Sequence, residues 1–378
     1  MAYSLNVSDF LEPVSLSMIS GDEDYSDGQL GRHIMIHDEA FPDLSLADVV
    51  LVGCPEQRGG GPAKKSHSPD QVRKELFRLY HWHTALNIAD AGNIRPGAAL
   101  SDTYAALKTV VSEINAAGKT ALVIGGSHDL TLAQYHAFAA RQQMIDAVCV
   151  DAKMDLDNIS LARSNTFLME MLTGEPNFIR HYNHIGFQSY LVHPHMLETL
   201  DKLRFYCYRV GKVRENMEEM EPVIRNASLF SFDVSAIAHA YAPANQLTPN
   251  GFTGDEACAL LRYAGMSRTA LSVGIYGYNA ALDKDNITAK QISQMIWYFF
   301  EGKARGSREA VITEKDSFNE FHIAFAEIDT TFMQSKRTGR WWMQLPDEQF
   351  IACSYNDYIQ ACNNEVPERW LRAQERSV

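Results

Sequence analysis

The segment that decides the fold is TALVIGGSHDLT, residues 120–131. Its first part is a continuous apolar run, and it continues into Gly125, Gly126, Ser127 and His128. A run of this kind predicts a strand that helices bury on both faces, as in a parallel sheet. The polar residues follow at the carboxyl end of that strand, where open parallel sheets bind their ligands. The segment therefore predicts an α/β fold with His128 at the functional edge.

Similar short apolar runs recur along the chain, with helical patterns between them. They lie at residues 48–53, 120–124, 146–151, 183–187, 204–208, 228–233, 270–275 and 321–326. Capping residues predict helix starts at Ser68, Thr253 and Thr288, and the helix after Ser101 should end near Gly118. Eight strands alternating with helices predict a three-layer αβα fold around a mainly parallel, eight-stranded sheet.

The alternation of strands and helices covers residues 48–326, and we expect residues 1–378 to form a single domain. Residues 1–47 form an acidic, loop-rich N-terminal extension. Residues 327–378 contain TTFMQSKRTGRWWMQLP, which predicts a hairpin turning near Thr338 and Gly339, followed by a polar tail. Such a hairpin could cover an edge strand, contact another subunit, or form a lid over the open end of the sheet.

The composition excludes several classes of protein. The chain is 46% hydrophobic and 21% charged, which is typical of globular proteins and unlike disordered ones. Its formal net charge of −13 argues against nucleic acid or an anionic membrane as a partner. The six cysteines show no CxxC spacing, as expected in a reducing compartment. With no signal peptide or membrane span in the sequence, we expect a soluble, cytoplasmic protein.

Three of the predicted strands end in residues that can bind a metal ion. A histidine follows the strand at 120–124. One aspartate is the last residue of the strand at 146–151, and a second aspartate follows that strand. A third aspartate is the last residue of the strand at 228–233. They are His128, Asp151, Asp155 and Asp233. Each alone is more often a turn former or a hydrogen-bonded structural residue. Together, an imidazole and three carboxylates at one sheet edge favour a site for Mn²⁺, Zn²⁺ or a similar ion.

These segments resemble a known family. VIGGSHDLT is similar to the GGxH element of the arginase, agmatinase and formimidoylglutamase family, VDAKMDLD to its DxHxD element, and SFDVSAI to its SxDxD element. Upstream, VLVGCPEQRGGGPAKKSHSPDQVRKEL resembles the family's first strand, glycine-rich loop and helix. Downstream, PNGFTGDEA resembles its GGLT-plus-Glu helix start. The resemblance covers about residues 48–330 and is nearest the formimidoylglutamase-like branch.

The resemblance implies a changed metal site. The family binds two Mn²⁺ ions bridged by a hydroxide, and its first-metal ligands all match: His128, Asp151, Asp155 and Asp233. The second-metal ligands do not, because the histidine of DxHxD is Lys153 and the last aspartate of SxDxD is Ser235. We therefore expect one Mn²⁺ per chain at most, or none. Lys153 follows Asp151 by two residues on an expected extended segment, so its ammonium is predicted to lie between Asp151 and Asp233, where the second ion would sit.

Two further positions depart from the family. Its proton-shuttle histidine aligns with Leu168, and the glutamate that meets the substrate's guanidinium aligns near Gly277. Lys153 and Asp155 are the candidate catalytic residues, with Lys153 placed to orient water or to stabilise developing negative charge. Random decay of an abandoned site is the alternative explanation for these losses.

Two functions follow from the resemblance. The first is hydrolysis of a C–N bond in a linear amidine or guanidino compound, of the formimidoylglutamate, agmatine or arginine type, through a metal-activated water and with impaired or altered activity. The second is a catalytically silent relative that binds a ligand or a partner subunit. The family also suggests a homo-oligomer, either a trimer or a hexamer.

Overall fold

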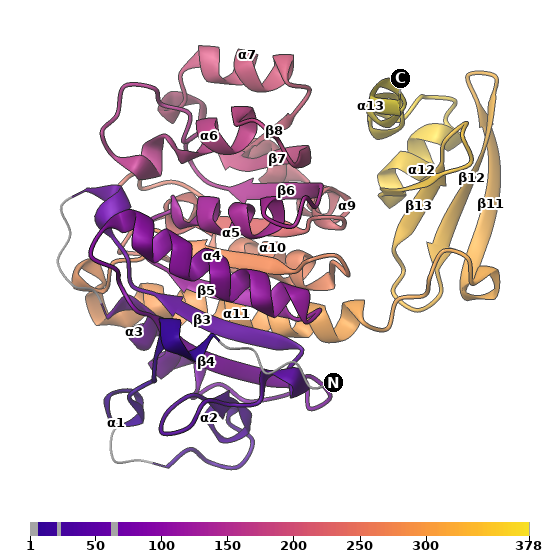
Figure 1. The fold of residues 1–378 in the computed structure, drawn as a ribbon. Coiled ribbons are helices and arrows are strands. Elements are labelled where there is room, and N and C mark those ends of the chain that lie inside the picture. Colours follow the sequence, from indigo (N-terminus) through magenta and orange to yellow (C-terminus); the bar gives the residue numbers. More distant parts are fainter. Residues whose placement is uncertain (1–6, 21–23, 62–66, 378) are drawn as a thin grey trace.

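The computed structural model describes residues 7–20, 24–61 and 67–377 (Figure 1). Parts of the predicted N-terminal extension and of the glycine-rich loop, residues 1–6, 21–23 and 62–66, lie outside the described residues. The main sheet has ten strands in the order β1-β4-β3-β5-β10-β9-β6-β7-β8, with β2 beside β4. The strands are β1 (Leu11–Glu12), β2 (Met35–Ile36), β3 (Val49–Cys54), β4 (Ile88–Ile94), β5 (Thr120–Gly125), β6 (Ile145–Val150), β7 (Ile179–Phe187), β8 (Tyr206–Arg209), β9 (Leu229–Asp233) and β10 (Ser272–Tyr276).

The predicted α/β fold is confirmed, because the described strands of this sheet all pair in parallel except β1 with β4. Seven of the eight predicted strands lie in it, but the count of eight is wrong. Strand β4 escaped prediction because Asp90, Gly92 and Asn93 interrupt its apolar run. The buried Asp90 carboxylate is stabilised by Arg73, whose Nε lies 2.7 Å from Asp90 Oδ2.

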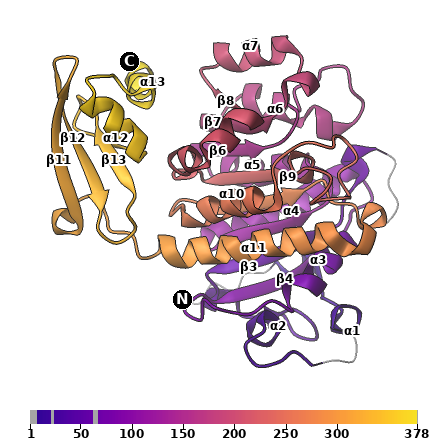
Figure 2. The same cartoon turned by 180° about the vertical axis from the view of Figure 1, so that it is seen from behind.

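Helices cover both faces of the sheet. The main ones are α3 (Ser68–Leu76), α4 (Leu100–Ala116), α5 (Leu130–Ala139), α6 (Phe167–Thr173), α7 (Pro194–Lys202), α10 (Gly254–Met266) and α11 (Ile287–Gly306). The short ones are α1 (Leu16–Ile19), α2 (Leu30–His33), α8 (Val210–Glu215) and α9 (Met220–Ile224). Helices α4 and α5 lie on one face of the sheet, and α3, α10 and α11 lie on the other (Figures 1 and 2). This arrangement is the predicted αβα sandwich. None of the described helices is long and apolar enough to cross a membrane.

The predicted helix ends are partly confirmed. Thr253 forms a capping box at the start of α10, and Gly118 follows α4 with a positive φ of 72°. Ser68 and Thr288 are not caps, because both are inside their helices. Their hydroxyls instead accept hydrogen bonds from backbone N–H groups of distant segments.

Residues 310–377, named here the C-terminal module, contain a second sheet. Its four antiparallel strands, in the order β11-β12-β13-β14, are β11 (Phe318–Phe325), β12 (Ile328–Ser335), β13 (Trp341–Gln344) and β14 (Phe350–Cys353). Helices α12 (Tyr355–Cys362) and α13 (Glu368–Ser377) follow them, and the module has an apolar core of its own. The β12–β13 hairpin and its turn at Gly339 are confirmed. The eighth predicted strand is β11, so its assignment to the main sheet was wrong, and the expected boundary at 326/327 separates two paired strands.

The C-terminal module lies at the amino ends of the main strands (Figures 1 and 2). Arg340 of the module donates from Nη1 to the backbone oxygen of Met266, the last residue of α10. Arg225 also contacts the module, and it lies just before the start of β9. The hairpin therefore neither pairs with the main sheet as an edge cover nor forms a lid over its carboxyl ends.

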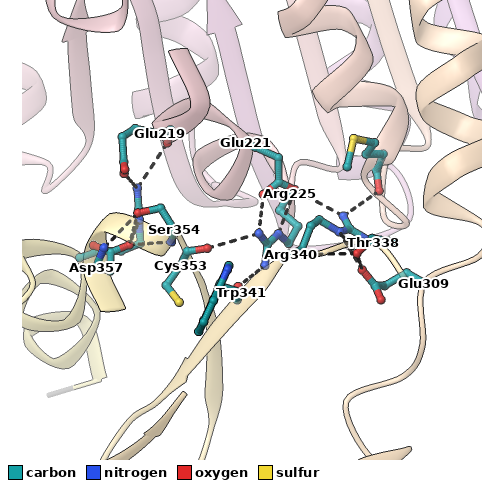
Figure 3. Close-up of polar contacts among 12 residues, drawn as sticks. Glu219, Glu221, Arg225, Glu309, Thr338, Arg340, Trp341, Cys353, Ser354 and Asp357 are labelled. Carbon is teal, nitrogen blue, oxygen red and sulfur yellow. Dashed lines mark hydrogen bonds and ion pairs between the residues drawn. The ribbon is translucent and has the colours of Figure 1, made fainter. Parts of the chain in front are cut away.

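Buried ion pairs join the core to the module (Figure 3). Arg340 Nε lies 2.8 Å from Glu309 Oε2, and its Nη1 lies 3.4 Å from Glu221 Oε1. Glu221 also pairs with Arg225, which donates to the backbone oxygen of Trp341 at 2.5 Å. All four charged groups are buried, so the pairing compensates charges that would be costly alone.

Candidate metal centre

The sheet topology brings the predicted ligands together. His128 lies in the loop between β5 and α5, Asp151 and Asp155 follow β6, and Asp233 is the last residue of β9. Strand β6 follows β5 in the sequence, but in the sheet β10 and β9 lie between them. The order of the strands therefore changes beside His128, and such a switch point opens a crevice at the carboxyl edge.

The four side chains form one buried cluster. His128 Nδ1 lies 2.9 Å from Asp155 Oδ2, 3.2 Å from Asp151 Oδ2 and 3.7 Å from Asp233 Oδ2. Ligand atoms of His128, Asp151 and Asp155 all lie within 4.8 Å of one another, a spacing that could hold a metal ion. None of the four residues is more than 7% exposed. The architecture expected from the strand ends is therefore present.

A second set of residues orients the His128 ring. Its Nε2 is 3.0 Å from Ser231 Oγ, which lies 2.6 Å from Thr131 Oγ1, and the ring packs edge-on against Phe167. Burial disfavours a charged imidazole, but the neighbouring Cys149 and the carboxylates of Asp151 and Asp155 raise the pKa of His128 well above its ordinary value. A metal ion bound at Nδ1 would displace this proton, because a ligating nitrogen must be unprotonated.

The aspartates are held by neighbouring groups. Ser235 Oγ donates to Asp151 Oδ1 at 2.7 Å, and the Ser235 N–H donates to Asp233 Oδ1 at 2.7 Å. His184 Nε2 lies 3.3 Å from the Asp151 backbone oxygen, and burial lowers the pKa of His184 to about 4. Burial and the charge of Asp151 raise the pKa of Asp233. The three carboxylates thus lie close together, each between 2.9 and 3.7 Å from His128 Nδ1.

Lys153 does not lie where the sequence predicted. Its Nζ is 3.1 Å from Asp155 Oδ1 and donates to Asn165 Oδ1, and neither Asp151 nor Asp233 is within ion-pair distance. The prediction assumed that side-chain alternation continues past Asp151, but β6 ends at Val150 and the next residues form bends and loops. Burial opposes the ammonium, yet the charges of the three aspartates raise the pKa of Lys153.

The two positions that depart from the family contain no reactive side chain. Leu168 lies in α6, is 1% exposed and belongs to an apolar cluster, so it cannot shuttle protons. Gly277 follows β10 with a φ of 76°, and a Cβ there would lie 2.6 Å from Asp233 Oδ2. A larger residue at Gly277 would therefore push the Asp233 carboxylate out of its present place.

Sequence reasoning missed several residues of the site. Ser231 and Thr131 orient His128, His184 contacts the backbone of Asp151, and Asn165 holds Lys153. Ser231 and Thr131 stand inside the quoted SFDVSAI and VIGGSHDLT segments, so their proximity to the ligands could have identified them. His184 and Asn165 carry no such local signal.

The donor set suits a divalent cation. Asp151 Oδ2 and Asp155 Oδ1 are buried and make no hydrogen bond with any described residue, although His128 and Lys153 lie within ion-pair distance of them. Imidazole nitrogen and carboxylate oxygen are ligands for Mn²⁺ and Zn²⁺, and buried carboxylates are stabilised by coordinating a metal. The residues present therefore fit one metal ion.

Comparisons with known proteins agree with this geometry. A formimidoylglutamase of Hahella chejuensis is 28% identical over 200 residues, which are 49% of this chain and 60% of that protein. The chain thus matches less than two thirds of that relative's length. A formimidoylglutamase structure from Bacillus subtilis superposes with a TM-score of 0.67 at 15% identity, covering 75% of this chain and 95% of that one. A Trypanosoma cruzi formiminoglutamase with Mn²⁺ gives a TM-score of 0.63 at 19% identity, covering 78% and 99%.

At these low identities the two structures show a shared fold. The family assignment comes from the sequence, because the arginase family model matches residues 47–301. The matched region contains the metal cluster and eight strands of the main sheet, β3 to β10. The C-terminal module lies outside it. The chain therefore belongs to the arginase family.

Proposed function

We propose that this chain is a metal-dependent hydrolase that cleaves a C–N bond of a linear amidine, with formimidoylglutamate as the first substrate to test. The observation that carries the proposal is the buried cluster of His128, Asp151 and Asp155 at the carboxyl edge of an arginase-family sheet. The similarity to formimidoylglutamases supports this substrate class over arginine or agmatine.

The proposed cofactor is Mn²⁺, at no more than one ion per chain, held by His128, Asp151, Asp155 and Asp233. Three carboxylates would balance one divalent ion and the Lys153 ammonium. A bound Mn²⁺ would lower the pKa of a coordinated water and so supply a hydroxide-like nucleophile. The Mn²⁺ in the Trypanosoma cruzi structure supports the choice of metal. Ser235 supports the low count, since its hydroxyl stands where the family pattern has another carboxylate.

Lys153 and Asp155 are the proposed catalytic pair. Asp155 and Asn165 hold the ammonium at the margin of the cluster, and the Lys153 side chain is 29% exposed. From this position Lys153 can donate hydrogen bonds to a substrate or water that enters from solvent. In the reaction, water adds to the amidine carbon, one C–N bond breaks, and the departing nitrogen takes up a proton. Lys153 stabilises negative charge as it develops.

A catalytically silent, ligand-binding relative is the second candidate. The burial of Leu168 and the absence of a side chain at Gly277 favour it, because the family's shuttle and amidinium anchor stand at those positions. General acid–base help is typically worth about 10²–10⁴-fold. We therefore expect activity toward formimidoylglutamate, agmatine and arginine far below that of family enzymes.

Metal analysis and product assays test both candidates. Purified protein, incubated with Mn²⁺ and desalted, is expected to retain up to one ion per chain. Formamide or ammonia is measured from formimidoylglutamate, and urea from agmatine and arginine. Asp155→Asn should abolish metal retention and any activity, while Asp316→Asn, on an exposed residue of the C-terminal module, should change neither.

The outcomes separate the candidates. Slow, Asp155-dependent turnover supports the hydrolase, and metal retention without turnover of any substrate supports the silent binder. Two ions per chain, or rapid turnover, would contradict the proposed changes to the site. Light scattering on the same sample tests the homotrimer or homohexamer that the family resemblance implies.

A further inference from the structure

A large cleft lies between the β7–β8 edge of the main sheet and the C-terminal module. One wall comes from β7, β8 and α8 of the core, and the other from β14, α12 and α13 of the C-terminal module. Its volume is about 860 Å³, within the usual range for small-molecule sites. Glu219 of the core and Asp357 of the module, which lie near each other in Figure 3, both line it.

The charges of the cleft are unevenly paired. Its four acidic residues all form ion pairs with three arginines of the cleft, Asp146 with Arg180, Glu219 and Asp357 with Arg369, and Glu368 with Arg372, which leaves one negative charge in excess. Two further cations line the cleft, Arg209 at the end of β8 and Lys212 in α8. Neither side chain has a hydrogen-bond or ion-pair partner among the residues that the structure describes. The cleft is thus net positive, in a chain whose formal net charge is −13.

Two amide side chains also line the cleft. Asn183 and Gln360 are half-buried on opposite walls, and neither side chain is hydrogen-bonded within the described part of the chain. Tyr206 adds an aromatic surface, over which the Arg372 guanidinium lies 4.5 Å from the ring centroid. Half-buried amides without protein partners suit a polar ligand, which would supply the missing hydrogen bonds.

We infer that this cleft binds a small anion bearing carboxylate or phosphate groups, held by Arg209 and Lys212 between the core and the C-terminal module. Both anion types accept charge-assisted hydrogen bonds from guanidinium and ammonium groups. The cleft is separate from the metal cluster, because none of His128, Asp151, Asp155 and Asp233 lines it. A ligand there contacts both parts of the protein and stabilises their association.

Isothermal titration calorimetry with inorganic phosphate and with succinate, at constant ionic strength, tests the inference on the full chain. We expect one site per chain, and whichever probe binds more tightly distinguishes phosphate from carboxylate recognition. The Arg209→Gln/Lys212→Gln double variant should lose about tenfold or more in affinity, because two charge-assisted contacts disappear. The matched control is Arg141→Gln/Lys284→Gln, which removes the same charges at exposed sites outside the cleft and should bind like the wild type.

Hydrogen–deuterium exchange locates the bound probe without any mutation. Protection of residues 204–216 and 349–373 on addition of the probe supports the cleft. Protection confined to the loops around His128 would place the anion at the metal cluster and overturn the inference. So would the absence of binding by both probes at millimolar concentration, or an equal loss of affinity in the cleft and control variants.

Discussion

The buried ion pairs of Glu221, Arg225, Glu309 and Arg340, named here the buried joint, connect the core to the C-terminal module. Removing one charge from them should loosen the module. The Glu309 carboxylate accepts hydrogen bonds from Arg340, Ser335 and Thr338, and its side chain is 3% exposed. The Glu309→Gln side chain has the same shape and keeps one acceptor oxygen. Its amide NH₂ group, however, would face Arg340, Ser335 and Thr338, which are themselves hydrogen-bond donors. Among the described residues, Arg340 then retains only Glu221, at 3.4 Å, as a carboxylate partner.

The expected loss follows from the burial of this pair. Breaking a buried pair by removing one partner costs about 3–5 kcal/mol, and the retained oxygen places this variant near 3 kcal/mol. The matched control is Glu314→Gln, because Glu314 pairs with Arg337 at 2.8 Å but both side chains are nearly half exposed. An exposed pair contributes about 0–1 kcal/mol, so the control should be close to the wild type.

Urea unfolding followed by tryptophan fluorescence measures the difference. Three of the five tryptophans, Trp341, Trp342 and Trp370, lie in the C-terminal module, so fluorescence reports mainly on its unfolding. Circular dichroism, to which the large core contributes most, should change less between the variants. If Glu309→Gln and Glu314→Gln shift the unfolding free energy equally, the buried network does not hold the module and the reasoning fails.

Three further predictions concern the metal cluster and the joint. Lys153→His with Ser235→Asp should raise the Mn²⁺ content from at most one to two per chain, while each single variant should not; elemental analysis that finds no gain would indicate a degraded site. Gly277→Ala should weaken Mn²⁺ retention about tenfold or more, because its Cβ would displace the Asp233 carboxylate; unchanged retention in a metal titration would contradict this. Burial favours the neutral acid of Glu309, but its hydrogen bonds and the nearby Arg340 guanidinium lower its pKa. The ionised carboxylate therefore stabilises the fold at any pH above the ordinary pKa of glutamate, and this stabilisation is lost as the pH falls through the lowered pKa of Glu309. The unfolding free energies of wild type and Glu309→Gln should therefore converge in acid, and a constant difference down to about pH 3 would refute that account.

The fold was predictable where burial alone determines the pattern. Apolar runs such as 120–124 and 228–233 are strands because both faces of the sheet are covered. Strand β4 was not found, because its polar residues are buried through contacts with a distant arginine. Strand β11 was found, but a strand's own sequence does not specify which sheet it joins. Pairing partners depend on long-range contacts that a local pattern does not contain.

The metal ligands were predictable for a similar reason. The carboxyl ends of parallel strands meet at one edge, so His128, Asp151 and Asp233 had to converge once their strands shared a sheet. Lys153 was misplaced because it lies beyond the end of β6, where the direction of a side chain depends on the loop. Its partner Asn165 is twelve residues away. The buried joint could not be foreseen either, since Glu221 and Arg340 are more than a hundred residues apart.

Helix α11 has a consequence for handling the protein. Its twenty residues, about 30 Å of helix, begin near the carboxyl edge of the sheet and end at the C-terminal module. The C-terminus is therefore carried to the side of the molecule away from the metal cluster (Figure 1). A resin, surface or affinity tag attached there would leave the carboxyl edge of the main sheet, with the proposed metal site, facing the bulk solution. Attachment through this end is thus the orientation to choose for immobilised assays.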